Sequence, residues 1–191
     1  MPDFLQKNWR KWTKQYISSK NKNPKVVFSW YQFQNKPVNQ HLKQPLKDLT
    51  KNHCSFCDGF PMGKMSRNTI EHFRPKSKYP ELSYCWTNLF IACDICQEKN
   101  DNFDKLLLKP DALDYEFSKY FIFDFLNGEI KPNPKTSKIA QERAKITIDI
   151  YGLNNDDKPI FRKEEYEDNE ADFLNNQLNI DKVSYRFMYK I

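Results

Sequence analysis

Two cysteine pairs carry the strongest chemical signal in this sequence. Cys54 and Cys57 form one C-x-x-C motif, and Cys93 and Cys96 form another. Each motif turns tightly enough to place two sulfurs on one ion, and four thiolates complete a tetrahedral Zn²⁺ site. Such a site leaves no position for water or substrate, so the sequence predicts a structural zinc. His53 remains an alternative ligand, although four cysteines already fill the site.

An acid-histidine pair stands between the two cysteine motifs. Imidazole titrates near neutrality, so His72 is a candidate general base that takes a proton from water. Glu71 offers a carboxylate to a hard divalent ion such as Mg²⁺ or Mn²⁺. Asn88 is expected to hold the loop that carries His72 through side-chain hydrogen bonds. A solitary Glu-His pair is a weak signal, but the enclosing cysteines and Asn88 strengthen it.

Further residues complete a set suited to phosphodiester hydrolysis, which needs an activated water and neutralisation of charge on the phosphate. Gln97 stands in the first turn after Cys96 and is the expected second oxygen ligand, with Glu98 and Asn100 as alternatives. Basic residues follow the acid-histidine pair and are placed to meet phosphates. These residues are Arg74, Lys76 and Lys78.

Composition is consistent with this chemistry and excludes some other classes. The formal net charge of +6 suits a nucleic-acid partner. The chain has only four glycines and contains neither GxGxxG nor GxxxxGK[ST], which argues against a nucleotide-binding domain. No apolar run is long enough for a signal peptide or a membrane span. We therefore expect a cytoplasmic protein with reduced cysteines, and Cys85 is interpreted as a small core residue.

The apolar spacing predicts an α+β fold. A strand ending in Glu71-His72, a loop anchored by Asn88 and a helix beginning at the second cysteine pair outline a zinc-stapled ββα-metal core with flanking helices. The predicted regions are an amphipathic helix and connector in residues 1–40, the core in residues 41–110, and a hairpin with helices in residues 111–191.

Several elements are predicted individually. The expected helices cover Asp3 to about Ser19, a short segment carrying Leu42, Leu46 and Leu49 with Pro45 in its first turn, Gln97–Leu106, Ile139–Tyr151 capped by Gly152, and Phe161–Asn176. Asn68–Arg74 is the expected strand, and Tyr120–Ile130 is the expected hairpin with a type I′ turn at Asn127-Gly128. The tail from Val183 to Ile191 is apolar and receives no assignment.

These motifs resemble the HNH endonucleases of the PtuB type, which act in Septu and related retron anti-phage systems. The resemblance rests on Cys54-Ser-Phe-Cys57, Ile70-Glu71-His72-Phe73-Arg74-Pro75-Lys76-Ser77, Trp86-Thr87-Asn88-Leu89, Cys93-Asp-Ile-Cys96 and the stretch from Ala144 to Asn154. It spans about residues 40 to 160. It implies a His-Me-finger nuclease, a divalent metal and a PtuA-type ATPase partner. In a retron system, a reverse transcriptase and its RNA–DNA product would join the partners.

The sequence departs from the family pattern after the second cysteine pair. The family commonly has Cys-Asn-x-x-Lys there, whereas this chain reads Cys96-Gln97-Glu98-Lys99-Asn100. Gln97 therefore occupies the usual position of an Asn or His ligand, and its longer side chain still offers an oxygen. Asn100 replaces the expected lysine, so that Lys99 is the candidate to bind nucleic acid in its place.

Three functions are compatible with these residues. The leading hypothesis is a metal-dependent HNH endonuclease that cleaves DNA or RNA and is a toxic effector controlled by partner proteins. The second is a zinc-dependent nucleic-acid-binding module without catalysis, which Gln97 favours. The third is an adaptor recruited through the aromatic N-terminal helix or the apolar tail.

Overall fold

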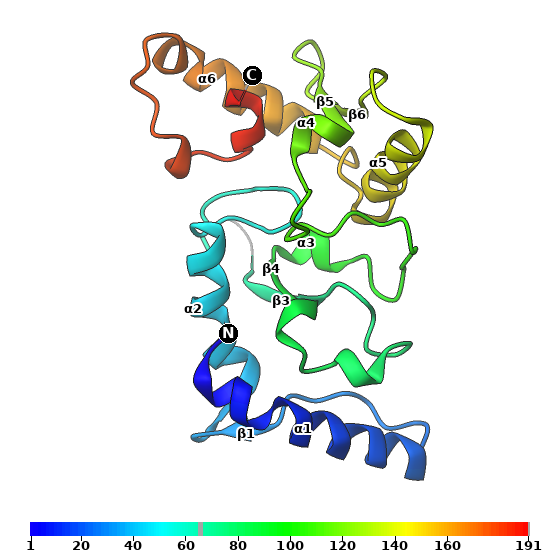
Figure 1. Cartoon of the computed structure of the whole chain (residues 1–191). Helices are drawn as coiled ribbons and strands as arrows, with labels where there is room; N and C mark the ends of the chain where they lie inside the picture. Colours follow the sequence, from blue (N-terminus) through cyan, green and yellow to red (C-terminus); the bar gives the residue numbers. More distant parts are fainter. Residues whose placement is uncertain (65–66, 191) are drawn as a thin grey trace.

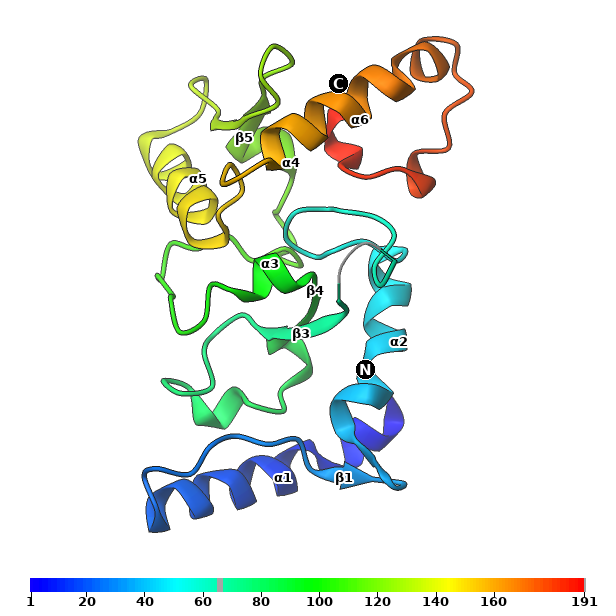
Figure 2. The ribbon, with the colours of Figure 1, turned by 180° about the vertical axis from the view of Figure 1, so that it is seen from behind.

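The described part of the chain folds into an α+β structure with three two-stranded antiparallel sheets and helices packed beside them. A computed structural model of the chain describes residues 1–64 and 67–190. Figures 1 and 2 show α1 (Asp3–Lys22) at one end and the pair β3–β4 beside α2 (Val38–Thr50) in the middle. Helices α5 (Lys138–Tyr151) and α6 (Lys158–Leu174) lie at the other end. The predicted α+β class is confirmed.

Helix α1 packs through one apolar stripe. Leu5, Trp12 and Tyr16 are buried along it, in agreement with their three- and four-residue spacing. Lys20 and Lys22 lie in the last turn, where cations interact favourably with the negative end of the helix dipole. The helix therefore runs beyond the predicted end near Ser19.

A short hairpin connects α1 to α2. It pairs β1 (Gln32–Phe33) with β2 (Lys36–Pro37), and Gln34 and Asn35 between them have positive φ angles of 47° and 61°. Two such residues form a type I′ turn. Because α2 begins at Val38, directly after the hairpin, Pro45 lies inside the helix and its predicted first-turn position was wrong.

The apolar stripe of α2 is only partly buried. Leu42 and Leu46 are in the core, whereas Leu49 is 70% exposed. Leu49 comes from the last turn of the helix, where it borders an open cavity. The predicted helix carrying Leu42, Leu46 and Leu49 is therefore confirmed, and its last leucine lies outside the core.

The central sheet pairs β3 (Thr69–His72) with β4 (Leu89–Ala92), and all four residues of β4 are buried. His72 lies opposite Leu89 in this register. Strand β3 is shorter than the predicted 68–74. The amide of Phe73 donates to the carbonyl oxygen of Asn88, but the amide of Arg74 donates to the Asn88 side chain, so the backbone pairing ends there. The intervening loop contains the 3₁₀ helices η1 (Pro80–Leu82) and η2 (Trp86–Asn88).

The helix after the second cysteine pair is a single turn, α3 (Asp94–Gln97). The predicted helix over 97–106 was wrong. Cys93 caps the N-terminus of α3 by accepting from the amide of Cys96, so the helix begins within the cysteine motif. Asn100 then adopts a left-handed conformation with φ of 51°, which ends the helical path.

The predicted C-terminal hairpin is confirmed, but its turn differs. Helix α4 (Phe117–Tyr120) leads into β5 (Phe121–Phe123), which pairs with β6 (Ile130–Pro132). A type I′ turn needs two residues with positive φ, and only Gly128 of the predicted pair has one, at 75°. A Cβ atom at Gly128 would lie 1.8 Å from the carbonyl oxygen of Pro159, so the glycine permits close packing of α6.

Helix α5 ends at Gly152 in the left-handed conformation, as predicted. Helix α6 begins earlier than the predicted 161–176 and carries Arg162 into the interior. The Arg162 guanidinium donates to the carbonyl oxygens of Gly128 and Leu153 at 2.7 Å and to the side chain of Asn154 at 2.8 Å. This one side chain therefore connects the hairpin loop, the end of α5 and α6.

The tail returns to the first cysteine motif through η3 (Ile180–Lys182) and η4 (Arg186–Tyr189). Arg186 donates from its amide to the Asp58 carboxylate at 2.7 Å and from Nε to both oxygens at 3.1 Å. Ile191 of the unassigned tail lies outside the described residues. Within residues 1–64 and 67–190, no helix combines the length and apolarity needed to cross a membrane.

Replacing Arg186 with Gln should lower the free energy of unfolding. The side chains of Arg186 and its partner Asp58 are mostly buried, with exposed fractions of 18% and 20%. Hydrogen bonds to a charged group contribute about 1.5 to 3 kcal/mol. We expect a loss in that range by urea denaturation. Lys182→Gln, which removes an exposed charge in the same tail, is the matched control. Equal stability of the two variants would show that the Asp58 pair contributes nothing.

Candidate functional site

The four cysteines converge on one point. All four sulfurs lie within 4.8 Å of one another, and Sγ of Cys93 is 3.8 Å from Sγ of both Cys54 and Cys57. A tetrahedron with Zn–S bonds of about 2.3 Å has edges of about 3.8 Å. The sulfurs are therefore spaced to fit zinc. The amides of Cys93 and Cys96 donate to Sγ of Cys54 and Cys93, both at 3.4 Å.

The thiols in this cluster have unequal acidities. Hydrogen bonding with Cys54 is the main cause in each case. It raises the pKa of Cys57 and Cys96, which burial raises further, and it lowers the pKa of Cys93. The protein alone thus favours a thiolate at Cys93 and opposes one at Cys57 and Cys96. A divalent cation would remove that opposition, because its charge stabilises every thiolate it binds.

His53 does not belong to this cluster. Its Nδ1 lies 2.8 Å from the carbonyl oxygen of Lys51, and its Nε2 lies 3.0 Å from that of Val183. Both ring nitrogens are therefore engaged with the backbone. The side chain joins the end of α2 to the tail, and the four cysteines are the better ligand set.

The ring of His72 is oriented by the loop that follows β3. Its Nε2 lies 2.9 Å from the carbonyl oxygen of Ser83. A carbonyl oxygen can only accept a hydrogen bond, so Nε2 carries the hydrogen and Nδ1 keeps its lone pair. Nδ1 is therefore the atom of His72 that can take a proton.

The surroundings of His72 keep it neutral. His72 is buried, with 4% of its surface exposed to solvent. Burial, together with the positive charges of Lys76 and Lys99, lowers the pKa of His72 to about 3 against the opposing effect of the Ser83 hydrogen bond. Near neutral pH the imidazole is uncharged, which is the form that a general base requires.

Asn88 holds the two ends of the loop together. Its Oδ1 accepts from the amide of Arg74 at 2.8 Å, and its Nδ2 donates to the carbonyl oxygens of Arg74 at 3.0 Å and Leu82 at 3.2 Å. The side chain is buried. These contacts have the geometry expected of a residue that positions the His72 loop.

Glu71 is buried beside a lysine. Nζ of Lys99 lies 2.8 Å from Oε1 of Glu71, and the Lys99 side chain has no exposed surface. Burial raises the pKa of Glu71, and the Lys99 charge opposes that rise. The structure thus gives Lys99 an internal carboxylate as its partner and removes it from the surface where a phosphate would bind, which argues against its predicted nucleic-acid contact.

A cavity of about 440 Å³ opens beside Glu71 and His72. Gln97 borders it, and its Nε2 donates to the carbonyl oxygen of Ile70 at 3.4 Å, so that Oε1 remains the available ligand atom. Oxygen-bearing side chains supply much of the lining: Glu71, Asp94, Gln97, Glu98, Asn100 and Asp101. Such a donor set suits Mg²⁺ or Mn²⁺ by its chemistry. Among the described residues, only the four cysteines bring donor atoms within 4.8 Å as a preformed metal cluster.

The predicted phosphate-binding residues lie around this cavity. Lys76 lines it, with Nζ 5.5 Å from the centre of the Phe28 ring. Lys78 is exposed and donates from Nζ to the carbonyl oxygen of Asp101 at 2.9 Å. Arg74 is exposed and its guanidinium lies 5.6 Å from the ring of Tyr79. Of the three cations in the loop after β3, Lys76 therefore lines the cavity, Lys78 contacts the lining residue Asp101, and Arg74 is exposed outside the lining.

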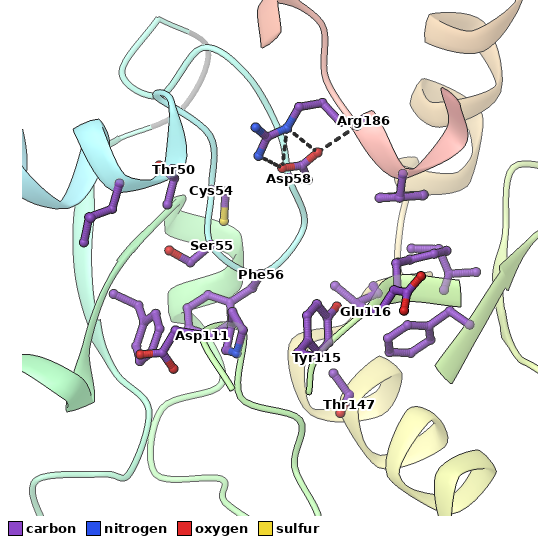
Figure 3. Close-up of a pocket in the computed structure, with 18 of the residues that line it drawn as sticks. Thr50, Cys54, Ser55, Phe56, Asp58, Asp111, Tyr115, Glu116, Thr147 and Arg186 are labelled. Atoms are coloured by element: carbon purple, nitrogen blue, oxygen red, sulfur yellow. Dashed lines mark hydrogen bonds and ion pairs between the residues drawn. The ribbon is translucent and has the colours of Figure 1, made fainter. Parts of the chain in front are cut away.

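A second, larger cavity lies between the first cysteine motif and the C-terminal region (Figure 3). Its volume is about 550 Å³, and Figure 3 shows Phe56 and Tyr115 among its lining and the Asp58–Arg186 pair beside it. His72, Glu71 and Gln97 do not line it. All three line the smaller cavity.

The chain is similar to a Septu protein. It is 25% identical over 124 residues to Septu protein PtuB of Bacillus thuringiensis, and the match covers 63% of this chain and 44% of that protein. The chain therefore spans less than half the length of this relative. No protein-family model matches the chain.

Sequence reasoning missed two parts of the site. The first is the buried Glu71–Lys99 pair. The lysine close to the second cysteine motif was a signal for it, but we interpreted that lysine as a surface charge. The second is the pair of aromatic residues, Phe28 and Trp30, whose rings contact His72. These lie in a connector without periodicity, and no local spacing links them to the core.

Zinc should be required for the folded core. We expect one zinc per chain by elemental analysis, and removal by a chelator should lower the melting temperature, because the metal holds two motifs that lie far apart in the sequence. Cys96→Ser should lose zinc and stability together. Cys85→Ser is the matched control and should retain both; zinc-free protein with unchanged stability would contradict the assignment.

Replacing Lys99 with Met should destabilise the protein by about 3 to 5 kcal/mol, because the change leaves the buried Glu71 carboxylate unpaired. Chemical denaturation measures this loss. Lys105→Met, at an exposed position, is the control. Adding Glu71→Gln to Lys99→Met should restore much of the stability, and a double variant no better than Lys99→Met would refute the pairing.

Proposed function

We propose that the chain is a metal-dependent endonuclease of the HNH type that hydrolyses phosphodiester bonds in DNA or RNA. The observation that carries this proposal is the orientation of His72. Its Nε2–H is bound to the Ser83 carbonyl, and its Nδ1 is left as a free base in a residue that borders a cavity rich in oxygen ligands. The Cys₄ cluster, β3–β4 and α3 together supply the outline of a ββα-metal core.

Each residue has a distinct task in this mechanism. Nδ1 of His72 accepts a proton from the attacking water. Glu71 and Gln97 would hold the catalytic ion, with Glu98 and Asn100 as further oxygen donors in the same lining. When bound, Mg²⁺ or Mn²⁺ supplies positive charge to the phosphate and the leaving oxygen.

Other residues act on the substrate and on these ligands. Arg74, Lys76 and Lys78 bind the phosphate backbone. Lys99 keeps Glu71 charged and in place within the protein, which replaces the nucleic-acid contact predicted for it. Asn88 holds the loop that bears the base.

The similarity to a Septu protein supports a role in anti-phage defence. In this role the chain is a toxic effector in the cytoplasm, controlled by a PtuA-type ATPase. A retron reverse transcriptase with its RNA–DNA product would be a further partner if the system is of the retron kind. The chain's net charge of +6 suits association with nucleic acid in either setting.

A non-catalytic nucleic-acid-binding module is the second candidate. It is favoured by Lys99, which already neutralises Glu71, and by Gln97 at the other ligand position. Incubation of the purified chain with plasmid DNA and with RNA, in Mg²⁺ or Mn²⁺ and then in EDTA, separates the two. The nuclease requires cleavage that EDTA abolishes, whereas binding without cleavage would identify the module.

His72→Ala should reduce cleavage by roughly 10²- to 10⁴-fold, the usual contribution of a general base. Zinc content should stay close to that of the wild type, and cleavage is measured at a temperature where the variant is folded, because the change also removes the buried ring's contacts with Ser83, Trp30 and Phe28. His41→Ala is the matched control, because it removes a partly buried histidine that also binds a backbone carbonyl, that of Phe33, at 2.8 Å. Full activity of the His72 variant would rule out this mechanism.

A further inference from the structure

Two aromatic rings from the N-terminal connector enclose the imidazole of His72. The Trp30 ring stacks on it with centroids 5.4 Å apart and an angle of 21° between the planes. The Phe28 ring meets it at 5.4 Å and 82°, which is an edge contact. Both arrangements are favourable for aromatic pairs. The hydrogen bond to Ser83 fixes one atom of the ring, and these contacts restrict its rotation about the side-chain bonds.

The two rings are themselves held by Tyr84. This side chain is fully buried, and its hydroxyl donates to the carbonyl oxygen of Ser29 and accepts from the amide of Tyr31, each at 3.1 Å. The two hydrogen bonds fix the backbone on both sides of Trp30. They are informative because residues 23–31 form no helix or strand that would otherwise set the position of the ring.

One turn of the chain therefore orients the imidazole in two ways. The carbonyl of Ser83 binds Nε2 of His72, and the hydroxyl of the next residue, Tyr84, holds the connector. The Tyr84 ring also contacts Trp30 at 5.4 Å and 89° and Phe28 at 5.5 Å and 47°. A substitution in the connector that moves Trp30 or Phe28 would therefore change the orientation of the His72 ring.

We propose that Phe28 and Trp30 are positioning residues that clamp the imidazole of His72 in a single orientation and in the Nε2–H tautomer. The catalytic meaning of this clamp rests on the nuclease proposed above. The clamp itself is a property of the fold. A region outside the ββα core thereby completes the site, since catalysis requires the base to stay within a fraction of an ångström of its working position.

The test measures the tautomer of His72 directly. In ¹⁵N NMR spectra of the zinc-loaded full chain, His72 should show the separated ring-nitrogen signals of a fixed Nε2–H tautomer. Trp30→Ala should move the two signals towards each other, because a mobile ring exchanges tautomers. Trp30→Leu fills most of the space without a flat ring and should give the same result if the alanine variant folds poorly.

The controls separate the clamp from general packing. Trp9→Ala removes another partly buried tryptophan of the N-terminal region and should leave the His72 signals unchanged. Trp30→Phe keeps a ring for stacking and should stay close to the wild type. His72 signals that are unchanged in both Trp30→Ala and Trp30→Leu would overturn the proposal.

Cleavage gives an independent readout if the chain is a nuclease. Trp30→Ala should then lower kcat by roughly 10- to 100-fold with little change in KM, since the base is misplaced while the phosphate contacts remain. Faster cleavage by Trp30→Ala would overturn the clamp, because it would mean that the rings block the base. If the wild type cleaves nothing, the nuclease fails while the NMR result still decides the clamp.

Discussion

The spacing of four sulfur atoms fixes how the two parts of the core meet. Cys54 and Cys57 follow α2, whereas Cys93 lies between β4 and α3 and Cys96 lies within α3. The four sulfurs lie within 4.8 Å of one another. The amide of Ser55 also donates to the carbonyl oxygen of Ile91, which aligns the first cysteine motif with the end of β4. Because β3 pairs with β4, the position of Glu71 and His72 depends on this cluster although neither residue belongs to it.

The loop between β3 and β4 positions the side chains around His72 on the core that the cysteine cluster holds together. Its neutral residues do the positioning: Ser83 binds the imidazole, Tyr84 holds the connector, and Asn88 ties the end of the loop to its beginning. Among its charged residues, Arg74 and Lys78 are exposed and Lys76 lines the cavity. The loop thus separates the groups that set geometry from those suited to meet a polyanion.

The sequence predicted best where the signal is local. The two C-x-x-C motifs, the stripe of α1 and the Gly152 cap depend on residues close together in the chain, and the structure contains all three. The helix expected over 97–106 was wrong because Asn100 adopts a left-handed conformation, which ends the helical path after one turn. Long-range pairs such as Glu71 with Lys99, and Trp30 with His72, have no fixed spacing and could not be predicted.

The buried Glu71–Lys99 pair also has an evolutionary consequence. Either residue alone would be a liability in the interior, since an uncompensated charge there is costly, whereas a neutral pair of similar volume is tolerated. Positions 71 and 99 should therefore change together as the protein diverges. Homologues that replace the acid with a neutral residue should also have lost the lysine. Joint substitution at the two positions would identify this contact in homologues even where the neighbouring residues differ.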